Sequence, residues 1–135
     1  LTVLDATLRD GFCDSKGGCI AAGKRIAGTA RTQAALGLDW RPHADWRVGA
    51  DWRHVGAIAA NDSNSVEAPG YSVLGLSAGY TRQWGPWKLD VFARIDNLAD
   101  KQYVGSVIVN ESNGRYYEAA PGRQWMAGLS ASYQF

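Results

Sequence analysis

The chain has 135 residues, which suits a single domain. Its formal net charge of +1 argues against a general nucleic-acid binder, which would show a concentrated basic face, and no nucleic-acid partner is expected. No run of about 18 apolar residues occurs, which excludes a transmembrane helix. The 16 glycines, 6 tryptophans and 6 tyrosines favour β structure instead.

Six segments alternate apolar and polar residues with the period of two that is typical of a strand with one apolar face. They lie at residues 1–8, 29–41, 45–59, 71–84, 87–97 and 122–135. In the first segment the alternation does not assign the residues clearly to two faces. The chain begins directly within this predicted strand, and no secretory signal precedes it. We therefore expect that further residues precede Leu1 in the parent protein.

The two faces of these segments differ in chemistry. Leu36, Val48, Leu89 and Leu129 belong to the apolar faces, which we expect to contact hydrocarbon. The opposite faces are expected to line a water-rich interior, and they carry charges of both signs: Arg31, Asp39, Arg47, Asp51, Arg53, Lys88, Asp90, Arg94 and Asp96.

The connections alternate in length along the chain. Residues 42–45 and 84–87 are predicted tight turns, whereas residues 9–28, 60–70 and 98–121 are predicted long loops. In an up-and-down meander this places every long loop on one side, as in outer-membrane barrels. Aromatic residues flank the short turns and the C-terminus, as an interfacial girdle does: Trp40, Trp46, Trp84, Trp87, Tyr133 and Phe135.

Six strands are too few for a membrane barrel, for which about eight is the usual minimum. An open sheet in lipid leaves the N–H and C=O groups of both edges unpaired, at a cost of several kcal/mol each. The fold prediction is therefore all-β: an antiparallel up-and-down meander of about six strands that forms the C-terminal part of a transmembrane β-barrel in the bacterial outer membrane.

From Val91 onward the sequence resembles TonB-dependent receptors. The stretch 95–103 is similar to their penultimate-strand motif through Asn97, Leu98, Asp100 and Tyr103, although Ala99 stands where an aromatic residue is usual. Pro121, Gly122 and Arg123 open the last strand as in the family, and the stretch 104–117 resembles the ferric-siderophore and ferric-citrate receptors. Residues 1–90 are compatible with the resemblance.

The resemblance implies a plugged barrel of about 22 strands that imports a ferric chelate with energy relayed by TonB. Residues 1–135 would form its C-terminal portion, and the plug domain, the upstream strands and the TonB-contacting segment would be absent. Outer-membrane lipid and lipopolysaccharide would surround it. No enzyme activity, cofactor or metal site is expected, because no catalytic set or phosphate-binding loop stands out.

The last strand ends in an apolar stripe formed by Leu129, Ala131, Tyr133 and Phe135. This stripe resembles the terminal signal that the barrel-assembly machinery recognises, and an unpaired terminal strand suits templated strand addition. The alternative interpretation is an ordinary lipid-facing strand that ends in an aromatic residue.

Cys13 and Cys19 lie in a glycine-rich loop with five residues between them. A disulfide fits an oxidising compartment and would add roughly 2 kcal/mol of local constraint. Free thiols are the alternative, and a metal site is a weak one because structural zinc normally takes four ligands.

Candidate ligand-binding residues are few. Arginine suits an anionic iron chelate because its planar fork donates paired hydrogen bonds. The candidates are Arg115, Tyr116, Tyr117, Arg25, Arg31 and His54. A solvated loop, or a contact with lipopolysaccharide phosphates, is the alternative. Asn61, Asp62 and Asn64 are similarly compatible with calcium but are explained by turn chemistry.

Two other functional classes remain open at this point. One is a small structural barrel of the outer membrane that is completed by oligomerisation. The other is a soluble β-barrel or sandwich that acts as a binding module. A plug domain encoded upstream would favour the receptor over the first alternative, and dependence on detergent would exclude the second.

Overall fold

A computed structural model of the chain describes residues 1–13 and 18–135. These residues form two compact units. Unit 1 comprises Leu1–Ala34, His54–Ser72 and Gln102–Pro121, and unit 2 comprises Ala35–Arg53, Val73–Lys101 and Gly122–Phe135.

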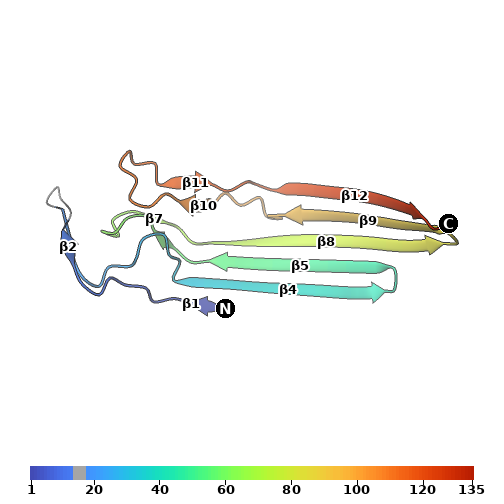
Figure 1. The fold of residues 1–135 in the computed structure, drawn as a ribbon, viewed down its shortest axis with the longest axis horizontal. Coiled ribbons are helices and arrows are strands. Elements are labelled where there is room, and N and C mark those ends of the chain that lie inside the picture. Colours follow the sequence, from blue (N-terminus) through green and yellow to red (C-terminus); the bar gives the residue numbers. More distant parts are fainter. Residues whose placement is uncertain (14–17) are drawn as a thin grey trace. The chain divides into compact units, whose positions relative to one another are not determined.

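The main sheet has six strands whose order in space is their order along the chain (Figure 1). They are β1 (Thr2–Val3), β4 (Thr32–His43), β5 (Trp46–Val55), β8 (Tyr71–Trp84), β9 (Trp87–Asp96) and β12 (Gln124–Tyr133). Among the register pairs, β8 pairs antiparallel with β9, and β9 with β12. The predicted all-β, six-stranded antiparallel meander is confirmed.

Unit 2 contains both tight turns, and within it these turns and the C-terminus lie at the same end of the strands (Figure 1). Gly85 and Pro86 join β8 to β9, and Gly85 has a φ of 55°, which glycine adopts without steric cost. The other turn is shorter than predicted, because β4 continues through Pro42 to His43.

The three long connections lie in unit 1, apart from residues 98–101, which belong to unit 2. Each of them contributes to a short antiparallel hairpin that the sequence did not predict. Residues 14–17 of the predicted first loop lie outside the described residues. The hairpins pair β2 (Phe12–Cys13) with β3 (Cys19–Ile20), β6 (Ile58–Ala59) with β7 (Glu67–Ala68), and β10 (Val104–Val107) with β11 (Tyr117–Ala119).

Two predicted strands are shorter in the structure. The third predicted segment, 45–59, divides into β5 and β6 at Gly56, whose N–H bonds the carbonyl of Thr32. The first, 1–8, is a strand only at Thr2–Val3. Several of its other residues bond the chain that leads into β4, as Leu8 N–H does with Lys24 O.

The buried apolar residues are small and lie in unit 1: Ala30, Ala59, Ala60 and Ala68. Among the described residues no large side chain is fully buried. In unit 2 the apolar face of the sheet is open, and Leu36 and Leu129 are 69% and 71% exposed. A sheet normally buries its apolar face against another layer, so we expect this face to be covered by something outside the described residues, either another protein segment or lipid.

No helix among the described residues is long and apolar enough to cross a membrane.

Candidate functional site

The polar face of unit 2 carries a cross-strand ion pair between Arg47 of β5 and Asp90 of β9, with Nη2 3.2 Å from Oδ2. Thr81 of β8, which lies between them in the sheet order, donates its hydroxyl to Asp90 Oδ2 at 2.5 Å. A Cβ at Gly79 would lie 3.2 Å from the guanidinium of Arg47. The arginine therefore lies flat over a glycine and reaches across β8.

A second ion-paired group lies on the same face. Arg94 of β9 contacts Asp51 of β5 at 3.1 Å and Asp96 of its own strand at 2.8 Å. A Cβ at Gly75 of β8 would lie 2.6 Å from Asp51 Oδ2, so only glycine leaves room for this carboxylate. Each exposed pair contributes little in water, about 0–1 kcal/mol.

The polar face therefore combines neutralised charges with unneutralised ones. Among the charged residues predicted for the polar faces of the strands, Asp39, Arg53 and Lys88 of unit 2 form no ion pair with another described residue, and neither does Arg31 of unit 1. Residues of this kind suit a hydrated interior, where water solvates them.

Aromatic residues gather on the apolar face next to the turn between β8 and β9. Trp84 pairs with Trp87, and Trp87 pairs in turn with Tyr133 of β12. The rings of Trp87 and Tyr133 lie 5.1 Å apart in an edge-to-face arrangement, as do those of Tyr133 and Phe135. Trp46 and Tyr80 form another ring contact, at 4.9 Å. These contacts fit the predicted aromatic girdle.

One charged pair on the apolar face was missed by the sequence analysis. Alternation along β8 places Arg82 on the face of Tyr80 and Trp84, and Arg82 forms an ion pair with Asp45 of the turn before β5. The alternation itself was the available signal, because it continues past Tyr80. The partner was not readable, since it depends on the register between β5 and β8.

The family-like motif at residues 97–100 forms a hydrogen-bonded turn. Asn97 is only 6% exposed and has a φ of 52°. Its side chain accepts a hydrogen bond from Lys101 N–H at 2.9 Å and donates one to Lys101 O at 2.8 Å. The N–H of Asp100 donates to Asn97 O.

The same turn holds the start of the last strand. Asp100 Oδ1 accepts a hydrogen bond from the N–H of Arg123 at 2.8 Å. A Cβ at Gly122 would lie 2.9 Å from that oxygen, so the glycine keeps the space open. The two separated parts of the motif are therefore one structural unit that joins β9 to β12.

In unit 1 the loop 60–66 bonds the loop that precedes β4. The side chain of Asn64 accepts from Arg25 N–H at 2.7 Å and donates to Arg25 O at 2.9 Å. Arg25 also forms an ion pair with Glu67 at 2.7 Å, and the hydroxyl of Tyr117 donates to Glu67 O at 2.9 Å. Segments from all three long connections are thus held together by hydrogen bonds.

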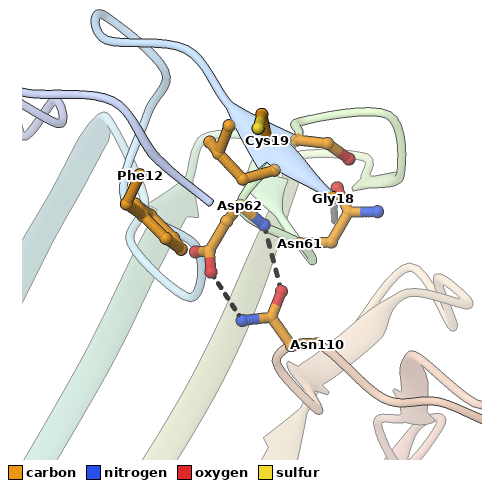
Figure 2. Close-up of a pocket in the computed structure, with 8 residues that line it drawn as sticks. Phe12, Gly18, Cys19, Asn61, Asp62 and Asn110 are labelled. Atoms are coloured by element: carbon orange, nitrogen blue, oxygen red, sulfur yellow. Dashed lines mark hydrogen bonds between the residues drawn. The ribbon is translucent and has the colours of Figure 1, made fainter. Parts of the chain in front are cut away.

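A cavity of about 440 Å³ lies beside these contacts (Figure 2). Its lining includes Phe12, Cys19, Asp62 and Asn110. The side chain of Asn110 accepts from Asp62 N–H at 3.1 Å and donates to Asp62 Oδ2 at 2.7 Å, as the dashed lines of Figure 2 show. A disulfide joins Cys13 to Cys19 across the β2–β3 hairpin.

The candidate calcium residues are held by turn hydrogen bonds. Asn61 Oδ1 accepts from Ser65 N–H at 2.9 Å, and Asn64 has a φ of 54°. Among the described residues no group of three metal-ligating side chains occurs.

The other candidate ligand residues of unit 1 are not brought to one point. Arg25 and Arg31 line a cavity of about 210 Å³, in which Arg25 is already paired with Glu67. Arg115 is exposed. Tyr116 and Tyr117 are in ring contact at 6.5 Å, and His54 Nδ1 lies 2.9 Å from Ser72 Oγ.

The terminal strand β12 is the last in the sheet order and pairs on one side with β9. Its apolar stripe is open: Leu129 is 71% exposed, Tyr133 and Phe135 are also exposed, and Ala131 lies between them on the same face. The outer edge of β12 thus offers backbone groups to a further strand.

The sequence model of the family described as TonB dependent receptor-like, beta-barrel matches residues 3–98. The chain belongs to the TonB-dependent receptor β-barrel family. The predicted family is confirmed, although the match lies mainly in the part of the chain that the sequence analysis had held only compatible with it. TonB-dependent receptors are transport receptors and not enzymes.

Solved structures of siderophore receptors and of a ferric citrate transporter share the fold. The chain is similar to BauA, the ferric preacinetobactin receptor from Acinetobacter baumannii, with a TM-score of 0.70 and 21% identity over 83% of this chain. It is also similar to the siderophore receptor PiuA from the same organism, with a TM-score of 0.72 and 21% identity over 90% of this chain. A third similar structure is the ferric citrate transporter FecA in the unliganded form, with a TM-score of 0.68 and 19% identity over 82% of this chain. The chain spans only 16–18% of those chains.

Proposed function

We propose that the chain forms closing strands of an outer-membrane TonB-dependent receptor that imports a ferric-siderophore-like ligand. One observation carries the proposal: the strands of a family member present an open apolar face and, on the opposite side, an ion-paired polar face. Lipid would cover the first face and water the second, which meets the requirement of each without a second protein layer.

The three long connections would then form the extracellular end, because successive antiparallel strands alternate in direction. We place the candidate ligand contacts there: Arg25, Arg31, His54, Arg115, Tyr116 and Tyr117. An anionic iron chelate is the ligand class that suits exposed arginine beside tyrosine, since both donate hydrogen bonds to oxygen-rich anions. The ferric ligands named for BauA and FecA support the choice of iron.

The remaining parts of the machine would lie elsewhere in the parent protein. A plug domain and the upstream strands would complete the barrel, and the TonB-contacting segment would precede Leu1. The open edge of β12 with Leu129, Ala131, Tyr133 and Phe135 would be recognised by the barrel-assembly machinery. Lipopolysaccharide would surround the extracellular end.

Growth on defined iron sources tests the transport role. Strains with and without the parent gene are grown with single ferric chelates as the only iron, and uptake of each chelate is measured with and without TonB. We expect one chelate to require both the gene and TonB. Equal growth on every chelate would remove the iron assignment, and uptake that is independent of TonB would remove the receptor mechanism.

The membrane placement has its own test. A lipid-soluble photoreactive probe is applied to the whole protein in membranes, and the labelled residues are identified. We expect label at Leu36, Val48, Leu89 and Leu129, and none at Asp39, Asp51 and Asp90. The reverse pattern would contradict a lipid-facing apolar side, and labelling of neither face would favour a soluble binding module.

A further inference from the structure

The ion pair between Arg82 and Asp45 occupies an unusual place in unit 2. Every other residue of β8 that shares the face of Arg82 between Leu74 and Trp84 is apolar or aromatic: Leu74, Leu76, Ala78, Tyr80 and Trp84. Its register partner on β9 is Leu89. On a face covered by hydrocarbon, an arginine costs about 2–4 kcal/mol at the membrane midplane but only about 0–1 kcal/mol at the interface.

The position of the pair matches the interface. Arg82 lies two residues before Trp84, at the end of β8 where the aromatic residues gather. Asp45 is a turn residue, and its carbonyl accepts a hydrogen bond from the N–H of Thr81 at 2.8 Å, which fixes the turn against β8. The ring contact of Trp46 with Tyr80 borders the pair. A cation and a carboxylate are thus held at headgroup depth.

We propose that Arg82, Asp45 and Trp46 form a binding site for the headgroup of a zwitterionic phospholipid that carries a phosphate and a primary ammonium, as phosphatidylethanolamine does. The inference rests on the proposed membrane placement. The Arg82 guanidinium donates to the phosphate, and the Asp45 carboxylate accepts from the ammonium. The face of Trp46 provides a second attraction for the ammonium.

Charge complementarity selects this occupant over an anionic lipid. The side chains of Arg82 and Asp45 are 45% and 22% exposed, so both charges are accessible to a headgroup. A headgroup with a phosphate and no cation would be attracted by Arg82 but repelled by the carboxylate of Asp45, with no ammonium to offset that repulsion. A headgroup with both charges satisfies both residues and leaves their own ion pair in place as one edge of a four-charge ring.

The test uses the whole protein, reconstituted in nanodiscs of mixed phosphatidylethanolamine and phosphatidylglycerol, with retained lipids measured by native mass spectrometry. We expect preferential retention of phosphatidylethanolamine, reduced about tenfold in Arg82→Gln, because a hydrogen bond to a charged group is lost. In Asp45→Asn we expect the preference to move toward phosphatidylglycerol. The matched control is Arg47→Gln, which breaks an arginine–aspartate pair of the same type on the polar face and should leave retention unchanged.

The outcomes separate this inference from the proposed function. A protein that does not enter the bilayer overturns both. A protein that inserts but retains both lipids equally, or retains phosphatidylglycerol preferentially, overturns the headgroup site alone. Equal loss in Arg82→Gln and Arg47→Gln would assign the effect to general destabilisation and would also overturn it.

Discussion

Replacing Asn97 tests whether the turn at the end of β9 is held by its side chain. Asn97→Ala removes two hydrogen bonds to the backbone of Lys101, each contributing about 1 kcal/mol. It also places alanine at a φ of 52°, which adds about 1 kcal/mol for the left-handed conformation. The sum is about 3 kcal/mol. Asn97→Gly keeps that conformation accessible and loses only the hydrogen bonds, so its effect should be about 2 kcal/mol.

The measurement is urea unfolding of the whole protein in vesicles, followed by tryptophan fluorescence. Asn113→Ala is the control, because Asn113 is an exposed loop residue whose side chain makes no hydrogen bond to another described residue, and the change should stay within about 0.5 kcal/mol. If Asn97→Ala is as mild as Asn113→Ala, the side chain does not hold the turn. If Asn97→Gly is the more damaging of the two, the argument from the positive φ is wrong.

Three further changes probe the sheet and the loops. Gly128→Ala should destabilise the protein by about 1–3 kcal/mol in the same unfolding assay, because the added Cβ would overlap the Phe92 ring. Phe92→Leu in the same chain should restore most of the lost stability, and the absence of this rescue would contradict the packing. Asn110→Ala should speed amide hydrogen exchange at Asp62, whose N–H it bonds, and unchanged exchange would show that the contact is absent in solution. Cys13→Ser should make the β2–β3 hairpin more sensitive to protease, because it removes a disulfide that contributes about 2 kcal/mol of constraint. Equal rates of cleavage before and after reduction of the native chain would argue against the disulfide.

The main strands were predictable because apolar and polar residues alternate along much of β4, β5, β8, β9 and β12, which are 10 to 14 residues long. The short hairpins were not, because strands of two to four residues are too short to show a period. They form where loop backbone groups find partners, as Ala60 N–H does at Val66 O. β1 likewise has only two residues, and after it the backbone bonds the chain that leads into β4.

The candidate site was predictable only at the level of residue types. The sequence singled out Asn97 and Asp100 through a family resemblance, but the contact of Asp100 with Arg123 joins residues 23 positions apart. Turn chemistry was the available physical signal, since Asn and Asp bond backbone groups a few residues on. The pairs Arg47–Asp90 and Arg94–Asp51 span three strands, and such pairs require the register, which alternation alone does not supply.

The glycines of β8 have a consequence for the width of any interior that this sheet encloses. Because Gly75 and Gly79 have no side chain, Asp51 and Arg47 lie flat against the sheet. At these positions the sheet would therefore extend into such an interior by only its backbone and one layer of side-chain atoms. In the proposed barrel, bulkier residues at these two positions would push those side chains into the lumen and narrow it. The passage of a large solute through that proposed barrel would therefore be tuned at two sites that never touch it.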